Sequence, residues 1–307
     1  MNCTTLLRRP LLKALFAASL ALAVPAALAA ATLDKVRNSG TLTIGYRSDA
    51  RPFAYTDPAG KPAGYSVELC RRVADAIQAE LKLPNLAIDF VPVTATTRFE
   101  MLAQGKIDMS CGTDTPTLAR RANVDFSLPI FLAGTGAVMR IDGDARVREV
   151  LSGRAAPAQP LWRGNPGEFG QKVTAAVVGG TTIETTLLDA LRRRRVEVNV
   201  VKVPDYGAGI RMVLDRSAVA LFGDRPVLLD AAQHGPGAGQ LLVIDRRFTR
   251  EPIALALPRG DADFRLLVDR TLSRLYRSKD IAALYTAHFG APGEEALNFF
   301  QTTALPE

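Results

Sequence analysis

The segment from Gly112 to Arg120 carries side chains that could hold a carboxylate. Thr113 and Thr115 lie a few residues before Arg120. A guanidinium fork donates two parallel hydrogen bonds to a carboxylate, and hydroxyl groups add further donors. Gly112 would let the backbone come close to a bound group, because it has no side chain. The spacing alone leaves open whether Arg120 binds a ligand or is a surface arginine on a short helix.

An acidic residue, Asp224, follows an apolar run at residues 218–222 that is expected to be a strand. Open α/β sheets bind ligands beyond the carboxyl ends of their strands. Its carboxylate could therefore accept hydrogen bonds from a bound ammonium group. The alternative is a helix N-cap, since Pro226 two residues later is typical of a helix start. The two roles can coexist.

Three further polar residues stand where expected strands end or helices begin. Thr182 opens a helix after two glycines, where its hydroxyl and nearby backbone N–H groups could bind an anion or only cap the helix. Arg47 ends the first expected strand, and Arg98 opens a helix. Either arginine could face a bound anion, or it could pair with a carboxylate of the protein itself.

The elements that would position these residues alternate between strands and helices. Apolar runs predict strands at residues 41–46, 87–91, 106–111, 173–178, 196–203, 218–222 and 252–257. Helical spacing of apolar residues predicts helices at 66–81, 98–103, 182–194, 206–214, 226–233, 264–276 and 281–289. This rhythm predicts an α/β fold with two units, largely parallel sheets and a helical tail. The proline-rich stretch around Trp162 is expected to be a surface loop or an insertion.

The N-terminus has the pattern of a secretory signal peptide. Arg8, Arg9 and Lys13 precede an apolar run at residues 14–28, and small residues with an A-x-A pattern follow at 27–29. A retained membrane anchor is the alternative reading. The formal charge of +7 falls to +4 without those three basic residues. Residues 192–195 are four arginines in a row; in an exported protein we interpret them as a solvated helix end and not as a nucleic-acid site.

Two cysteines remain after the signal peptide, Cys70 and Cys111. An oxidising destination allows a disulfide. Because Cys70 falls on the apolar face of the 66–81 helix, we expect buried thiols instead. His234 and His288 stand far apart without other ligands nearby, so neither a metal nor another cofactor is expected.

A series of motifs resembles the family-3 amino-acid-binding proteins of ABC importers. They are LDKV at 33–36, GTLTIG at 40–45, PFAY at 52–55, GYSVEL at 64–69, GKID at 105–108, GTDT at 112–115, DFS at 125–127 and GTT at 180–182. The resemblance implies a type II periplasmic-binding-protein fold, with a ligand cleft between two lobes joined by two crossing strands. After the signal peptide at 1–29, it implies lobe 1 at 30–136 and 250–307, and lobe 2 at 137–249. It also implies a periplasmic monomer whose partner is an ABC permease.

Within that family the chain looks most similar to the glutamate/aspartate-binding proteins. The carriers are GYRS at 45–48, PVT at 92–94 followed by Arg98, CGT at 111–113 and LNF at 297–299. The likeness implies that Arg120 holds the α-carboxylate, Asp224 the ammonium, and Arg47 and Arg98 a side-chain carboxylate. The implied ligand-binding set is Arg47, Arg98, Thr113, Thr115, Arg120, Thr182, Tyr206 and Asp224.

Three departures from the pattern bear on side-chain specificity. Tyr206 stands where the acidic-amino-acid binders carry histidine, Ala95 stands where they carry serine, and the stretch around Trp162 looks inserted. Three arginines against Asp224 leave an excess of two positive charges in the expected cleft. An acidic amino acid compensates that excess better than a neutral one, so glutamate or aspartate is predicted.

Two other functions share this fold. An enzyme similar to the cyclohexadienyl dehydratases needs a general acid in the cleft, and Glu184 is the carboxylate to nominate. Its place in the first turn of a helix explains it more simply. A soluble amino-acid sensor is the other alternative. No catalytic triad or phosphate-binding loop is found in the sequence, so a non-enzymatic binding protein is the prediction.

Overall fold

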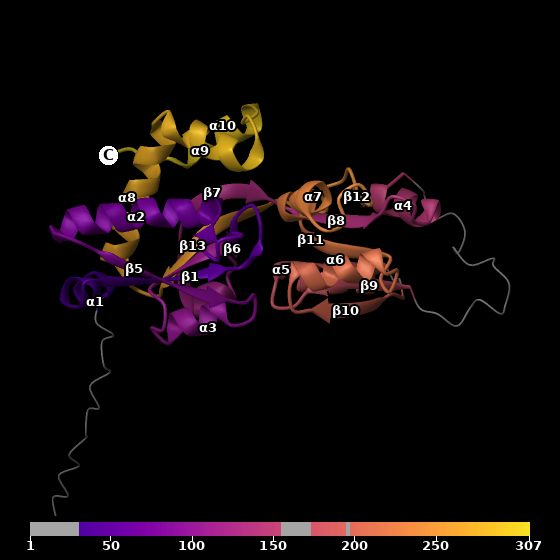
Figure 1. Cartoon of the computed structure of the whole chain (residues 1–307), viewed down its shortest axis with the longest axis horizontal. Coiled ribbons are helices and arrows are strands. Elements are labelled where there is room, and N and C mark those ends of the chain that lie inside the picture. Colours follow the sequence, from indigo (N-terminus) through magenta and orange to yellow (C-terminus); the bar gives the residue numbers. More distant parts are fainter. Residues whose placement is uncertain (1–30, 155–172, 195–196) are drawn as a thin grey trace, which may run out of the picture. The chain divides into compact units, whose positions relative to one another are not determined.

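The computed structural model describes residues 31–154, 173–194 and 197–307 (Figure 1). The signal peptide, the stretch around Trp162 and part of the arginine run lie outside these residues. The described chain folds into α/β units built on two five-stranded sheets and one three-stranded sheet. The α/β fold class is therefore confirmed.

The first sheet has the strand order β5-β1-β6-β13-β7. These strands are β1 (Thr41–Arg47), β5 (Ala87–Val93), β6 (Met109–Asp114), β7 (Val124–Ala133) and β13 (Glu251–Pro258). β1 runs parallel to β5 and β6, while β13 is antiparallel to β6 and β7. The sheet is therefore mixed, and β13, which lies between β6 and β7, comes from near the end of the chain.

The second sheet has the order β10-β9-β11-β8-β12. Its strands are β8 (Thr135–Arg140), β9 (Thr174–Val178), β10 (Asn199–Val203), β11 (Ala220–Asp224) and β12 (Leu241–Val243). β9 is parallel to β10 and β11, and β8 is antiparallel to β11 and β12. The two sheets thus repeat one plan, with a parallel half and an antiparallel half.

Helices cover the sheets because alternate strand residues point to opposite faces. In β13, Ile253, Leu255 and Leu257 belong to one apolar cluster, whereas Ala254 and Ala256 belong to another. Figure 1 shows α2 on one side of the first sheet and α3 on the other. The described helices are α1 (Thr32–Ser39), α2 (Tyr65–Leu81), α3 (Arg98–Ala103), η1 (Arg120–Ala122), α4 (Ala145–Ser152), α5 (Thr182–Arg194), α6 (Tyr206–Leu214), α7 (Arg225–His234), α8 (Ala262–Arg277), α9 (Asp280–Phe289) and α10 (Glu294–Thr303).

A small antiparallel sheet precedes α2. It comprises β2 (Asp49–Ala50), β3 (Ala54–Thr56) and β4 (Pro62–Ala63). The periodicity of the sequence did not predict these short strands. It also missed β7, β8, β12, α1, η1, α4 and α10.

Two strands begin and end later than predicted, and both shifts matter for the site. β6 begins after Asp108, whose carboxylate accepts hydrogen bonds from Lys35 Nζ at 2.7 Å and from the Thr43 N–H at 2.8 Å. The strand then runs from Met109 to Asp114 and includes Thr113. Likewise β11 ends at Asp224 itself. Thr113 and Asp224, which were predicted to follow their strands, are thus part of them.

The chain crosses between the sheets twice. β7 ends at Ala133 and β8 begins at Thr135, with Gly134 between them, and the return enters β13 at Glu251. A Cβ atom on Gly134 would lie 2.0 Å from the carbonyl oxygen of Thr249. The two connections therefore pack backbone against backbone, which only glycine permits. The exact lobe boundaries drawn from the sequence remain a prediction.

The expectation of free thiols is wrong: Cys70 and Cys111 form a disulfide. Their Cα atoms are 6.5 Å apart, and both residues are fully buried. Cys70 lies on the apolar face of α2, as predicted, and that face packs on β6, where Cys111 points into the same core. The apolar face of a helix can be predicted from the sequence, but the strand that packs against that face, here β6, cannot.

Candidate ligand-binding site

Arg120 opens the short helix η1 and reaches toward the second sheet. Its Nη1 donates to the carbonyl of Thr115 at 2.7 Å, and its Nη2 donates to the carbonyl of Gly180 at 3.2 Å. Burial, together with the positive charge of Arg98, lowers the pKa of Arg120 to about 10. Among the described residues, no carboxylate lies within ion-pair distance of its guanidinium. Such a group is suited to receive a carboxylate from outside the chain.

Phe99 lies against two of the predicted arginines. The centre of its ring is 4.1 Å from the guanidinium carbon of Arg98 and 4.8 Å from that of Arg120. An aromatic face attracts a cation electrostatically at such distances. Phe99 therefore helps to orient both guanidinium groups, and its position next to Arg98 was the one sequence feature that could have indicated this role.

Asp224 is the last residue of β11 and directly precedes α7. Its side chain makes no capping hydrogen bond to that helix, so the N-cap alternative does not account for its carboxylate. The Tyr206 hydroxyl donates to Asp224 Oδ2 at 2.9 Å and accepts the backbone N–H of Asp224 at 3.0 Å. Burial raises the pKa of Asp224, while Tyr206, the charge of Arg47 and a hydrogen bond from Thr113 act against that rise.

The contact between Thr113 and Asp224 joins the first sheet to the second. Thr113 belongs to β6 and Asp224 to β11, and Thr115 follows directly after β6. All three residues are less than a tenth exposed. The segment with Thr113 and Thr115 and the carboxylate of Asp224 are therefore brought together.

Arg98 is engaged with the protein itself. Its Nε donates to Asp114 Oδ1 and its Nη1 to the carbonyl of Ala95, while Ser110 Oγ donates to the other oxygen of Asp114 at 2.7 Å. Arg98 is 1% exposed and Asp114 is fully buried. This buried ion pair holds the strand end and α3 together.

Arg47 also has a partner within the chain, Asp49. Its Nε and Nη2 donate to the two carboxylate oxygens at 2.6 and 2.7 Å. Burial lowers the pKa of Arg47, but the hydrogen bonds and charge of Asp49 outweigh burial and leave the pKa above its ordinary value. A Cβ on Gly112 would lie 2.9 Å from Arg47 Cγ. Gly112 thus makes room for the Arg47 side chain. The sequence analysis had explained this glycine only by the approach of a ligand.

The charge count made from the sequence is therefore wrong. It set three arginines against Asp224 and omitted Asp49 and Asp114. With these and Glu251 included, three guanidinium groups face four carboxylates. Asp49 and Asp114 stand beside Arg47 and Thr113 in the sequence, so counting every carboxylate near a predicted strand end would have found them.

Thr182 and Tyr206 have protein partners too. The Thr182 hydroxyl donates to Glu251 Oε2 at 2.8 Å, and Thr249 Oγ1 donates to the other oxygen of that carboxylate at 2.8 Å. Glu251 is the first residue of β13, so this link ties α5 to the crossing connection. The Tyr206 hydroxyl is committed to Asp224. Glu251, which the sequence analysis missed, is a further carboxylate beside the site.

Glu184, nominated as a general acid, serves the helix start instead. Its carboxylate accepts the Gly180 N–H at 2.9 Å and pairs with Lys202 Nζ at 2.6 Å. The hydrogen bond from Lys202 lowers the pKa of Glu184. A carboxyl group with a lowered pKa holds its proton poorly, which does not suit a general acid.

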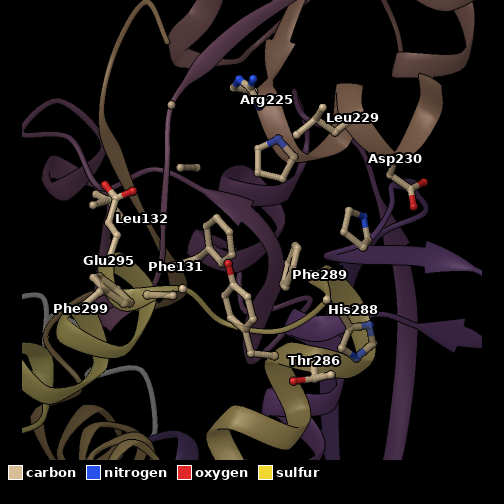
Figure 2. Close-up of a pocket in the computed structure, with 18 of the residues that line it drawn as sticks. Phe131, Leu132, Arg225, Leu229, Asp230, Thr286, His288, Phe289, Glu295 and Phe299 are labelled. Atoms are coloured by element: carbon tan, nitrogen blue, oxygen red, sulfur yellow. The ribbon is translucent and has the colours of Figure 1, made fainter. Parts of the chain in front are cut away.

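A cavity of about 590 Å³ lies elsewhere, and none of the predicted ligand-binding residues lines it. Figure 2 shows Phe131, Phe289 and Phe299 at its wall, with Leu229 and Asp230 of α7 nearby. Its lining includes the β7 end and Gly134, so the cavity adjoins the crossing connection. It is distinct from the cluster around Arg120 and Asp224.

The chain belongs to family 3 of the bacterial extracellular solute-binding proteins, whose model matches residues 42–291. The L-glutamate/L-aspartate-binding protein of Pseudomonas aeruginosa is 30% identical over 281 residues, or 91% of this chain and 86% of that protein. The glutamate/aspartate import solute-binding protein of Salmonella typhimurium is 25% identical over 86% of this chain and 81% of its own length. These relatives are named as binding proteins.

Solved structures support the same architecture. An ancestral amino-acid-binding protein, a precursor of cyclohexadienyl dehydratase, is 26% identical with a TM-score of 0.67 and covers 84% of this chain and 99% of its own. A variant of the Thermotoga maritima arginine-binding protein has a TM-score of 0.67 at 22% identity, over 84% of this chain and 99% of its own. The two-lobed type II fold is confirmed. Within the described ranges, no helix is both long and apolar enough to cross a bilayer.

Proposed function

We propose that this protein is the periplasmic solute-binding component of an ABC importer and that it binds a small amino acid, with glutamate or aspartate favoured. The observation that carries the proposal is that a partly buried guanidinium, Arg120, and a buried carboxylate, Asp224, lie in one site without forming an ion pair with each other. Arg120 has no carboxylate partner among the described residues. Its charge interacts with that of Asp224 only electrostatically, without an ion-pair contact. An amino acid presents both complementary groups.

In this proposal Arg120 holds the α-carboxylate, with donors from Thr113 and Thr115. Asp224 accepts the ammonium group, while Tyr206 holds the Asp224 carboxylate in place. Thr182 contributes at the start of α5. A charge buried without a partner costs several kcal/mol, so a ligand carrying both charges in the right places gains most.

Support for an acidic side chain comes from two sources. Three relatives at 25–30% identity are named for glutamate and aspartate, and the positive charge of Arg98 acts on Arg120 while that of Arg47 acts on Arg98. A glutamine-binding protein of Geobacillus stearothermophilus is also similar, at 27% identity over 225 residues. The choice between acid and amide is therefore the feature that an experiment must decide.

We further propose that residues 1–29 are removed on export. Lobe 1 then comprises 30–136 and 250–307, and lobe 2 comprises 137–249. The mature protein acts as a monomer that delivers its ligand to an inner-membrane permease. The family is extracellular, which is consistent with this route.

Calorimetry with glutamate, aspartate, glutamine and asparagine tests the proposal. Arg120→Ala and Asp224→Asn should each weaken every cognate amino acid by on the order of 3–5 kcal/mol, because each leaves a ligand charge buried and unpaired. The matched controls are Arg121→Ala and Asp245→Asn, which remove the same charges at exposed positions and should leave binding unchanged. Near-normal affinity in a folded Arg120→Ala or Asp224→Asn variant contradicts the assignment.

A further inference from the structure

The carboxylate of Asp49 is held by donors that would suit a free carboxylate. Arg47 Nε and Nη2 donate hydrogen bonds to its two oxygens at 2.6 and 2.7 Å. Oδ2 also accepts the backbone N–H of Tyr206, the first residue of α6, at 3.2 Å. A guanidinium fork combined with a helix N-terminus is a strong anion-binding arrangement. Here an anion of the chain itself fills it.

Asp49 is also placed to interact with both sheets. It begins β2, directly after β1 of the first sheet, while Tyr206 begins α6, which packs on the second. Arg47 is 1% exposed and the Asp49 side chain 18% exposed. The pair therefore sits at the junction where Tyr206 holds Asp224, and the Arg47 guanidinium carbon lies 5.9 Å from the Tyr206 ring centre.

A second carboxylate on the ligand would have to compete with Asp49 for Arg47. Arg98 is a weaker substitute, because its Nε and Nη1 already donate to Asp114 and to the Ala95 carbonyl. An amide or hydroxyl side chain carries no charge and meets no repulsion from Asp49. The position of Asp49 therefore bears on side-chain choice more than on binding of the shared amino-acid groups.

We propose that Asp49 is a specificity-determining residue: it occupies the Arg47 fork as an internal counter-ion and reduces the preference for acidic over amide side chains. This inference rests on the proposed function, in which the cleft binds an amino acid and Arg47 faces its side chain. A native preference for glutamate would then be smaller than the preference of the same site with a free Arg47.

The test is the ratio of the Kd values for glutamine and glutamate. Asp49→Asn keeps the side-chain shape and removes the charge. The Kd for glutamine divided by the Kd for glutamate should therefore rise roughly tenfold, which means a stronger preference for glutamate. The control is Asp142→Asn. Asp142 binds Arg140 in the same way, two residues apart, with Nε–Oδ1 and Nη2–Oδ2 distances of 2.7 and 3.0 Å at the surface. That variant should leave the ratio unchanged.

A double variant, Arg47→Gln with Asp49→Asn, removes both charges and leaves neither buried alone. Its ratio should return to within about threefold of the native value, since the guanidinium is then absent. This variant also serves if Asp49→Asn does not fold. A tenfold loss of acid preference in the double variant relative to native protein would mean that Arg47 acts on the ligand despite Asp49, and would overturn the inference.

An unchanged or lower ratio in folded Asp49→Asn also overturns it. The proposed function fails in a different way, namely if native protein binds none of the four amino acids. Suppose that native protein binds these amino acids, that Arg120→Ala does not, and that the ratio of glutamine to glutamate Kd values is the same in the native protein and the Asp49 variants. The proposed function is then supported, and the proposed role of Asp49 is wrong.

Discussion

Removal of the Tyr206 hydroxyl tests how Asp224 is held. In Tyr206→Phe, the carboxylate loses a donor that lies at 2.9 Å, and the backbone N–H of Asp224 loses an acceptor at 3.0 Å. Hydrogen bonds to charged groups contribute about 1.5–3 kcal/mol, and a buried donor left unpaired costs about 1–3 kcal/mol. Since Tyr206 is 3% exposed, water cannot easily replace the hydroxyl. We expect the free energy of unfolding to fall by about 3 kcal/mol at neutral pH.

The pH dependence of that loss separates this reasoning from a simple packing effect. Burial raises the pKa of Asp224, and the Tyr206 hydroxyl opposes that rise. Because the folded-state pKa lies above the unfolded one, the ionised carboxylate costs stability as pH rises through it. At low pH the carboxyl group is protonated and needs the donor less. The destabilisation by Tyr206→Phe should therefore shrink as the pH falls toward about 4.

Urea unfolding followed by circular dichroism at about pH 7 and about pH 4 measures both effects. Tyr46→Phe is the control, since its buried hydroxyl makes one neutral hydrogen bond, to Thr56 at 3.1 Å. It should cost about 1 kcal/mol at either pH. If Tyr206→Phe changes stability by less than about 0.5 kcal/mol, or by the same amount at both pH values, the account of Asp224 is refuted.

Three other outcomes are expected. Reduction of the Cys70–Cys111 bridge, which spans 41 residues, should lower the free energy of unfolding by about 4 kcal/mol, and identical urea midpoints with and without reductant would contradict this. Gly134→Ala should destabilise the protein by about 1–3 kcal/mol because the added Cβ meets the Thr249 carbonyl. Gly293→Ala is the control, since a Cβ there has no atom within 4 Å. Equal stability of the two variants would count against a tight crossing. N-terminal sequencing of the periplasmic protein should begin close to Ala30, and retention of Met1 on the major species would refute export with cleavage.

The order of strands and helices could be predicted from the sequence because apolar periodicity is a local property. The 98–103, 182–194 and 206–214 helices match α3, α5 and α6. The motif order also indicated the family and the two-lobed fold. Arg120 and Asp224 could be nominated as a complementary pair, since strand ends and helix starts are where α/β proteins hold their ligands.

The partners of the charged side chains could not be predicted in the same way. Asp49 and Asp114 lie next to nominated residues, yet only the fold turns each carboxylate toward Arg47 or Arg98. Tyr206 and Asp224 stand 18 residues apart and meet because α6 packs on β11. The Cys70–Cys111 bridge likewise required α2 to lie on β6. Sequence therefore determined which groups could carry charge, while tertiary packing decided which charges are already paired, because pairing depends on distances of a few ångströms between distant segments.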